Sequence, residues 1–430
     1  MLHPADPVSR VNLGEVLLAE IEALDLRAED PRMAAQATAL RLEARGHFEC
    51  ALRENASCER AHEGLSYLLR DAGNEATAAW HRRAAFQGRC VMPCGSATVG
   101  NDAMPVLHLV SARGGNLRIA ELFDLQRFPI TLVLPEFFDP KVSLPAHRLV
   151  WNCIGDAEIA PAGLAAAQAL LAFTRAPVIN APVAVMATGR AENARRLARL
   201  PGVVAPRMAV LAREQLSGAA VAAQLARLGL DYPLLLRAPG FHNGRHFVRL
   251  ERALDLPAVL SALQGRELIA MQFLNGRGTD GKFRKYRAMT IDGELYPLHL
   301  AVSSRWKVHY YSAEMSDHAG HRAEDAAFLE DMPAVVGPRA MAALHRIQAT
   351  LGLEYGGIDF GLNDHGDLLL FEANATMAVT PPEAGAKWDY RRTAYHRIRA
   401  AVNQMLADRC QADGVAAAIP GAVMTADLAS

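Results

Sequence analysis

Cysteine, lysine and long hydrophobic runs are all scarce in this chain. Six cysteines in 430 residues are too few for the disulfide framework of a small secreted protein. No run approaches the ~20 apolar residues of a membrane-spanning helix, and the chain does not open with a basic segment followed by an apolar one. We therefore expect a cytoplasmic protein that has no membrane contact.

Neither sign of charge is in excess, with 45 Lys and Arg against 46 Asp and Glu and a formal net charge of −1. Non-specific binding of nucleic acid depends on an excess of basic charge, so we expect no nucleic-acid partner. Only five of the basic residues are lysines, which makes each lysine more informative than an arginine. Three of the five, Lys282, Lys285 and Lys307, fall in one short stretch.

Hydrophobic residues make up 51% and charged residues 21% of the chain, enough for a packed core over two or three domains. Residues 1–90 carry apolar residues at helical spacing, and proline is absent from 33 to 92. Residues 61–86 resemble one tetratricopeptide repeat, with Gly73 at its turn, and Gly46 would be the turn of a weaker copy. A repeat pair and a small helical bundle both remain open.

Residues 90–104 are small, polar and rich in turn formers, which predicts a linker. From Val106 onward, short apolar runs alternate with helical segments, which is typical of β-α-β units on a sheet buried on both faces. A helix is predicted over about 182–199. Residues 267–312 read mostly as strand, and this includes the segment that alternates Arg305, Lys307 and His309.

The most informative segment is GGIDFGLNDHGDLLLFEANATM, residues 356–377. Two apolar runs flank a strong turn signal, which predicts a β-hairpin. Glu372 and Asn374 are two residues apart and share a face, and a turn centred between positions 364 and 365 places Asp359 opposite Leu370 on the same face. Three oxygen donors, Asp359, Glu372 and Asn374, thus predict a site for Mg²⁺ or Mn²⁺. The competing interpretation is a half-exposed hairpin with a polar face.

The order of these segments resembles the ATP-grasp superfamily of carboxylate–amine ligases. The branches most like it contain glutathione synthetase, D-alanine–D-alanine ligase and the ligases that add glutamate to ribosomal protein tails. The resemblance covers about residues 105–400. It implies an α/β chain with the α+β ATP-grasp fold behind an all-α, tetratricopeptide-like domain at 1–90. An α/β domain at 104–180, an ATP-grasp domain of two α+β subdomains at 181–408, and a mobile tail at 409–430 complete this division.

The resemblance also implies roles for individual residues. ATP would be held by two cations, two loop glycines, a hinge strand and a ribose-binding acid: Arg190, Arg237, Gly240, Gly244, Gln272, Phe273, Leu274 and Asp280. The metal would be held by Asp359, Glu372 and Asn374. Arg287 or Arg305 would stabilise the tetrahedral oxyanion. The strand face with Arg305, Lys307 and His309 would meet the carboxylate or the acyl phosphate, and a solvated strand face is the alternative. Arginine stands at 190 and 237 where the family usually has lysine, and the hinge strand lacks the family's glutamate.

The implied reaction is ATP-dependent. ATP would phosphorylate a carboxylate, and an amine would displace phosphate from the acyl phosphate, on an amino acid or peptide substrate. A small-molecule kinase of the same fold and a non-catalytic nucleotide-binding scaffold are the alternatives. The helical region could recruit a protein or peptide partner or form an oligomer, and residues 1–90 do not choose between these roles.

Overall fold

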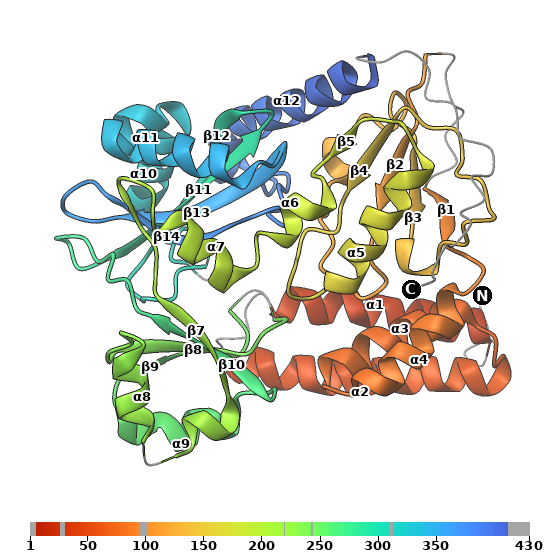
Figure 1. Ribbon diagram of the computed structural model, residues 1–430, viewed down its shortest axis with the longest axis horizontal. Helices are drawn as coiled ribbons and strands as arrows, with labels where there is room; N and C mark the ends of the chain where they lie inside the picture. Colours follow the sequence, from red (N-terminus) through yellow and green to blue (C-terminus); the bar gives the residue numbers. More distant parts are fainter. Residues whose placement is uncertain are drawn as a thin grey trace, which may run out of the picture.

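The computed structural model describes residues 6–25, 31–94, 102–218, 220–241, 244–309 and 313–411. Together these residues form an all-helical N-terminal region and three β-sheets with their covering helices (Figure 1). The predicted fold class, α/β with an all-helical N-terminal region, is therefore confirmed. Within the described ranges, no helix is both long and apolar enough to cross a membrane.

The N-terminal region is built from α1 Pro7–Asp25, α2 Pro31–Glu54, α3 Glu59–Asp71 and α4 Glu75–Phe86. Phe48 of α2 is fully buried between Gly14 of α1 and Gly64 of α3, and a Cβ atom at either glycine would overlap its ring. Gly73 lies between α3 and α4 with φ of +79°, as a turn there requires. The turn predicted at Gly46 is wrong, because Gly46 lies inside α2.

The first sheet has the strand order β1-β3-β2-β4-β5. Its strands are β1 Val91–Cys94, β2 Val106–Leu109, β3 Ile130–Val133, β4 Leu149–Asn152 and β5 Val178–Ile179, and α5 Pro161–Leu170 packs beside them. β2 to β5 are parallel, and β2 and β4 are buried along their whole length. The predicted linker is wrong at its start, because β1 pairs with β3 as an antiparallel edge strand.

The small sheet has the order β7-β10-β8-β9 and is antiparallel throughout. Its strands are β7 Met208–Ala212, β8 Leu234–Arg237, β9 Phe247–Leu250 and β10 Glu267–Gln272. Leucines of α8 Val221–Arg227 and α9 Leu256–Ala262 join one of its faces in a single hydrophobic core. The helix predicted over 182–199 is interrupted, since α6 Pro182–Met186 ends before α7 Arg190–Leu197 begins.

The central sheet has the order β12-β11-β13-β14-β6. Its strands are β6 Val203–Val204, β11 Phe283–Ile291, β12 Glu294–Ser303, β13 Tyr355–Leu362 and β14 Leu368–Asn374. Its helices are α10 Ala319–Glu330, α11 Met332–Leu351 and α12 Arg392–Gln411. Short 3₁₀ helices occur at Ala120–Leu122, Pro135–Phe137, Leu171–Phe173, Arg213–Leu216, Ala253–Asp255 and Ala386–Arg391.

Two sequence predictions change in this part of the chain. Residues 304–309 are not a strand, and positions 310–312 of that predicted strand lie outside the described residues. At the other end, α12 continues to Gln411, past the predicted start of the tail, and positions 412–430 lie outside the described residues.

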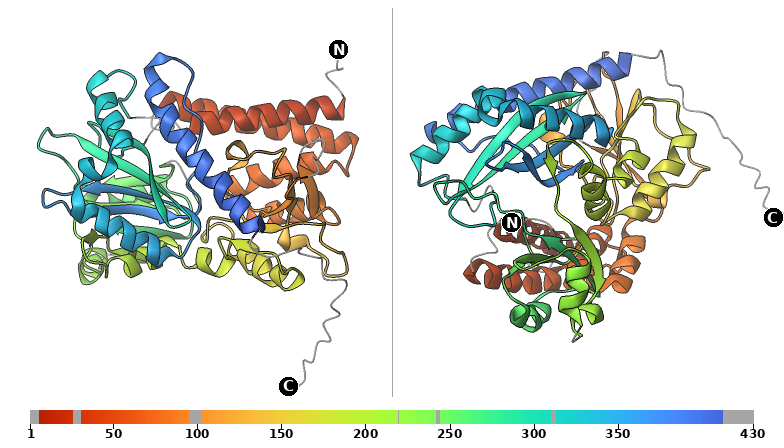
Figure 2. Two further views of the ribbon diagram at one scale, coloured as in Figure 1. Left: turned by 90° about the horizontal axis from the view of Figure 1, so that it is seen from above. Right: turned by 60° about the vertical axis from the view of Figure 1, so that its left-hand side comes forward.

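The first and central sheets are held together by polar contacts from α12 and from the end of β5. The amide of Asn403 on α12 donates to Leu122 O at 2.7 Å, and α12 crosses between the two parts of the molecule (Figure 2). Asn180, with φ of +56°, exchanges two hydrogen bonds with the backbone of Tyr355 on β13. These contacts hold the carboxyl ends of the parallel strands beside the central sheet.

The packing around Phe48 makes a prediction about two glycines of the helical region. Gly64→Ala should lower the free energy of unfolding by about 1–3 kcal/mol, since the methyl group would overlap the buried ring. Gly46→Ala is the matched control: it has open space and should raise stability by up to ~1 kcal/mol through helix propensity. Urea unfolding followed by circular dichroism checks both, and a Gly64→Ala variant as stable as the parent would contradict the packing.

Candidate functional site

The β13–β14 hairpin carries the two carboxylates of the predicted metal site. Asp359 lies directly opposite Glu372, and Phe360 lies opposite Leu370. The predicted pairing of Asp359 with Leu370 is therefore wrong, because a bulge between Asp359 and Phe360 shifts the register. Such a bulge leaves one extra residue on one strand, and here it brings the two carboxylates closer together than the unbulged hairpin would.

Asp359 is buried between two cations of the neighbouring strand β11. Its oxygens accept hydrogen bonds from Arg287 Nε at 2.5 Å, Arg287 Nη2 at 2.8 Å and Lys285 Nζ at 3.0 Å. Lys285 and Arg287 are two residues apart, so both side chains lie on one face of β11. Burial would raise the pKa of Asp359, but the charges of Arg287 and Lys285 hold this pKa well below its ordinary value. Asp359 is therefore ionised at neutral pH.

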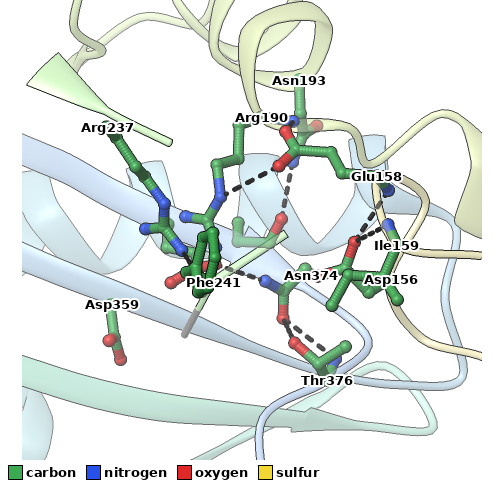
Figure 3. Close-up of polar contacts among 12 residues, drawn as sticks. Asp156, Glu158, Ile159, Arg190, Asn193, Arg237, Phe241, Asp359, Asn374 and Thr376 are labelled. Atoms are coloured by element: carbon green, nitrogen blue, oxygen red, sulfur yellow. Dashed lines mark hydrogen bonds and ion pairs between the residues drawn. The ribbon is translucent and has the colours of Figure 1, made fainter. Parts of the chain in front are cut away.

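Glu372 is held by the first residue of α7. Arg190 Nη2 lies 2.6 Å from Glu372 Oε1, and the Arg190 backbone N–H donates to Glu158 Oε1 at 3.0 Å (Figure 3). Asn193, one turn further along α7, donates to Ala373 O at 2.6 Å. The start of α7 is thus fixed to β14 and to the loop after β4, and Arg190 lies where the three elements meet.

The predicted metal ligands can be tested against their present partners. Asn374 donates to Glu372 Oε1 at 2.8 Å, while its own amide oxygen accepts from the backbone N–H and the hydroxyl of Thr376, both at 2.9 Å. In the described ranges no group of three or more His, Cys, Asp or Glu is placed to hold a metal, and the predicted set contains only two such residues plus an amide. Glu372, a quarter exposed and paired with one cation, and Asn374 are neighbouring hard oxygen donors of the kind that Mg²⁺ takes, whereas Asp359 is buried between two cations.

Arg237, at the end of β8, is a buried cation. It is 8% exposed, its guanidinium donates to Phe241 O, and its Nε has no hydrogen-bond partner. Among the described residues no carboxylate forms a salt bridge with it, and the guanidinium of Arg190 lies close by (Figure 3). Burial and the charge of Arg190 lower the pKa of Arg237 to about 10. An anion is the group that this position lacks.

The loop that follows Arg237 approaches a second predicted cation. Gly240 and Gly244 have φ of +78° and +72°, a backbone conformation that favours glycine. A Cβ atom on Gly244 would overlap the side chain of Lys307. The structure therefore brings together the predicted loop glycine and predicted Lys307, although they come from different sheets.

An apolar cluster covers the face of the small sheet that α8 and α9 leave open. It consists of Met208, Leu235, Phe247, Ile269, Met271, Phe273 and Trp306. Trp306 meets Phe247 and Phe273 edge to face, with ring centroids 5.5 and 6.1 Å apart. Met208 also lines a small pocket with Arg190, Glu372 and Asn374. Trp306 was missed in the sequence, although its position between predicted Arg305 and Lys307 was a usable signal.

The hinge strand is only partly available for a base. The Gln272 backbone N–H donates to Arg207 O at 2.8 Å, and its side-chain oxygen accepts from the Arg207 N–H. The predicted contact of adenine with backbone groups of 272–274 would therefore use groups other than this N–H. Phe273 lies in the apolar cluster, and Leu274 directly follows it.

Other predicted site residues lie elsewhere. Asp280 forms a salt bridge of 2.9 Å with Arg284, and Arg284 also binds Glu324 of α10. In the described chain Asp280 makes no polar contact with Arg190 or Arg237. The predicted alternation of Arg305, Lys307 and His309 along a strand is wrong, because these residues follow an irregular path after β12.

Charges of the cleft nevertheless act on His309; the cleft is the pocket lined by Arg190, Glu372 and Asn374 together with the neighbouring Arg237 and Asp359. Burial and then the charges of Lys285 and Arg287 lower the pKa of His309 to about 3, so it is neutral at pH 7. The charges of Arg287, Asp359 and Lys307 also act on His309. The Arg305 backbone N–H instead donates to the Ser303 hydroxyl at the end of β12.

Comparisons with known proteins give likenesses of structure. No family model and no curated protein sequence matches the chain. A RimK domain ATP-grasp protein from Sphaerobacter thermophilus is 19% identical, with 71% of this chain and 99% of that chain covered and a TM-score of 0.43. D-alanyl-alanine synthetase A from Vibrio cholerae O1 biovar eltor is 12% identical, with 73% and 100% covered and a TM-score of 0.45.

A third solved structure, carboxyaminoimidazole ribonucleotide synthase from Aspergillus clavatus complexed with ATP, is 14% identical. The match covers 68% of this chain and 75% of the synthase chain, with a TM-score of 0.42. Because these identities are below 25% and the TM-scores below 0.5, the proposals below rest on this chain's own strands and side chains.

The two carboxylates of the hairpin should respond differently to neutralisation. Asp359→Asn leaves Lys285 and Arg287 buried without their counter-charge, and removal of one partner from a buried ion pair typically costs about 3–5 kcal/mol. Glu372→Gln removes a more exposed carboxylate and should lower the free energy of unfolding by only about 1 kcal/mol. Urea unfolding at pH 7 checks this order.

The ion pairs of Asp359 with Lys285 and Arg287 also predict that the stability depends on pH. The folded-state pKa of Asp359 lies below its unfolded value of about 4, so its stabilisation is complete above that value and is lost as the pH falls through the folded-state pKa. The stability difference between the parent and Asp359→Asn should therefore shrink below about pH 4. A difference that is independent of pH would show that the ion pairs do not stabilise the fold.

Proposed function

We propose that the chain is an ATP-dependent ligase that joins a carboxylate to an amine. The γ-phosphoryl group of ATP would pass to a carboxylate oxygen and leave ADP. The amine nitrogen would then attack the carbonyl carbon, lose a proton and displace phosphate, so that an amide, ADP and phosphate are released. We propose an amino acid or a peptide as substrate and the cytoplasm as the site of action.

The observation that carries this proposal is the buried guanidinium of Arg237 beside that of Arg190. Two neighbouring cations, one of them without a carboxylate partner in the described chain, favour an anionic ligand with several oxygens. Arginine makes bidentate contacts with phosphate. The loop with Gly240 and Gly244 follows Arg237 directly and allows backbone N–H groups to approach such a ligand.

The apolar cluster of the small sheet supports a base next to those phosphates. The Arg237 guanidinium lies 5.8 Å from the Phe247 ring centroid, so the cation and the apolar surface are adjacent. Trp306 and Phe273 offer flat apolar faces of the kind that line ligand sites. A nucleoside triphosphate, which has a flat aromatic base at one end and negatively charged phosphates at the other, fits this arrangement.

The hairpin and β11 would serve the reacting end of the nucleotide. Glu372 and Asn374 would hold Mg²⁺, which when bound offsets charge on phosphate oxygens. Arg287 and Lys285, already aligned along one face of β11, would stabilise negative charge on the acyl group by fixed electrostatic contacts. Lys307, whose side chain lies against Gly244, would also contact the phosphates. No covalent nucleophile is required, because positioning supplies much of the rate.

Product analysis separates this ligase from its alternatives. Purified protein would be incubated with ATP and Mg²⁺ against a panel of amino acids and short peptides, with EDTA as the metal-free control. Substrate-dependent ADP and free phosphate, lost with EDTA, is the expected result. ADP without free phosphate would instead identify the kinase alternative. AMP and pyrophosphate would overturn the acyl-phosphate mechanism, and ATP binding without turnover on any substrate would favour the scaffold.

The role proposed for Arg237 predicts that its replacement weakens ATP binding without lowering the stability of the free protein. Arg237→Met should weaken ATP binding about 10- to 100-fold, because a charge-assisted hydrogen bond contributes about 1.5–3 kcal/mol. Without nucleotide the same variant should be as stable as the parent or more stable, since it removes a buried cation whose pKa burial already lowers. Isothermal titration with ATP and urea unfolding provide the two measurements.

Arg391→Met is the matched control for a buried guanidinium. Arg391 is 5% exposed at its side chain and pairs with the fully buried Asp325 at 2.5 Å. Its removal should lower the free energy of unfolding by about 3–5 kcal/mol and leave the intrinsic ATP affinity of the folded protein close to that of the parent. If Arg237→Met destabilises the free protein as much as Arg391→Met does, Arg237 is a structural residue and the phosphate assignment fails.

A further inference from the structure

The loop that carries Gly244 is anchored in the N-terminal helices. Arg245, the next residue, places its Nη1 2.9 Å from Asp25 Oδ2 and its Nη2 2.9 Å from Asp71 Oδ2. Both carboxylates are 8% exposed and the Arg245 side chain is 17% exposed. This contact is therefore a largely buried, two-pronged ion pair between the small sheet and the helical region.

The helical region needs this cation for electrostatic reasons. Asp71 is the last residue of α3, where the helix dipole is already negative and carboxylates are disfavoured, and Asp25 is the last described residue of α1. Arg41 of α2 lies 2.5 Å from Asp25 and 3.3 Å from Asp71, so one cation of the helical region serves two carboxylates. Arg245 supplies the second positive charge. Without it a carboxylate would stay buried without compensation.

The same side chain is connected to the proposed phosphate site. The Arg245 guanidinium lies 5.3 Å from the Phe241 ring centroid, and the carbonyl of Phe241 accepts the hydrogen bond of Arg237. Gly244, adjacent in sequence, lies against Lys307. An unbroken series of contacts therefore runs from the ends of two N-terminal helices to the cations that would bind ATP.

The last turn of α3 also contacts the first sheet's domain. Arg70, the neighbour of Asp71, donates to the carbonyl of Arg113 in the loop after β2. Figure 1 shows the N-terminal helices running beneath the first sheet, with one end of these helices next to the small sheet. Two adjacent residues of one helix thus contact both the first sheet's domain and the loop of the small sheet.

We propose that the N-terminal helical region is a positioning element for the nucleotide loop, with Asp25 and Asp71 holding Arg245 so that Gly244 and Arg237 are placed for the triphosphate. This inference rests on the proposed function of the same site. It gives residues 7–86 a role inside the catalytic unit. Asp25, Asp71 and Arg245 are positioning residues, since they act on the nucleotide through the loop.

The test compares Arg245→Met with the double variant Asp25→Asn/Asp71→Asn in the full-length chain. Both should weaken ATP affinity about tenfold, with a larger effect on the KM for ATP than on kcat. Both should also increase amide hydrogen exchange across residues 238–250 in the absence of nucleotide, while exchange in β11 and β12 stays as in the parent. Combining all three substitutions should add little, because each variant breaks the same contact.

Arg118→Met is the control, since Arg118 joins the helical region to the first sheet's domain through Glu22 at 2.7 Å without contacting the loop. It should change neither readout. Arg245→Lys should recover part of the lost affinity, because a lysine reaches one carboxylate but cannot span two. Unchanged loop exchange and unchanged ATP affinity in the carboxylate variants would overturn the inference.

The two readouts separate this inference from the proposed function. If the parent protein binds no ATP, the proposed function fails and the role of the helices in nucleotide binding fails with it, while the exchange measurement still shows whether they hold the loop. If the parent binds ATP but only the exchange changes, the loop is anchored without consequence for the nucleotide and the inference is wrong. Should the carboxylate variants fail to fold, Arg245→Met and Arg245→Lys decide the question from the loop side.

Discussion

The carboxylate of Asp359 lies out of water between two cations of the adjacent strand, and this buried pair restricts how the central sheet can be assembled. Arg287 lies opposite Asp359 in the register of β11 and β13, while Tyr286 and Phe360, also paired, stack at 5.2 Å on the other face. A slip of one residue would turn the cations into the apolar core and the aromatic rings toward the cleft. The register of the sheet and the charge of the cleft are therefore set by one arrangement.

The cleft differs from an ordinary charged surface in how its cations are satisfied. Arg190 and Arg287 each have a carboxylate within 2.6 Å, whereas Arg237 forms no salt bridge within the described residues and donates to the carbonyl of Phe241. Compensated cations are found in many structural networks, so they do not by themselves identify a ligand. Arg237 is stronger evidence for a ligand, because a buried cation without a salt bridge is unfavourable. Natural proteins retain such a cation where a ligand completes the site.

Local signals allowed the sequence to predict the hairpin, the loop glycines and the existence of most strands. The Asn-Asp-His-Gly turn and the spacing of Asp359, Glu372 and Asn374 lie within one short segment, so their proximity does not depend on the rest of the fold. Spacing alone could not show the bulge that places Asp359 opposite Glu372. Lys285 and Arg287, which pair with Asp359, come from another strand. The sequence of β11 alone does not show which carboxylate these two cations will meet.

The helical region shows why long-range charge pairing escapes sequence reasoning. Asp25 and Asp71 look like ordinary acids near helix ends, and Arg245, their partner, is 220 and 174 residues away. A boundary near residue 90 remains a reasonable prediction from composition, yet the last turns of α1 and α3 share buried charges with the loop after β8. A helical module that only recruited a partner would not need two buried carboxylates paired with the loop after β8. Their burial there is explained more simply if the helices and the loop work as one unit.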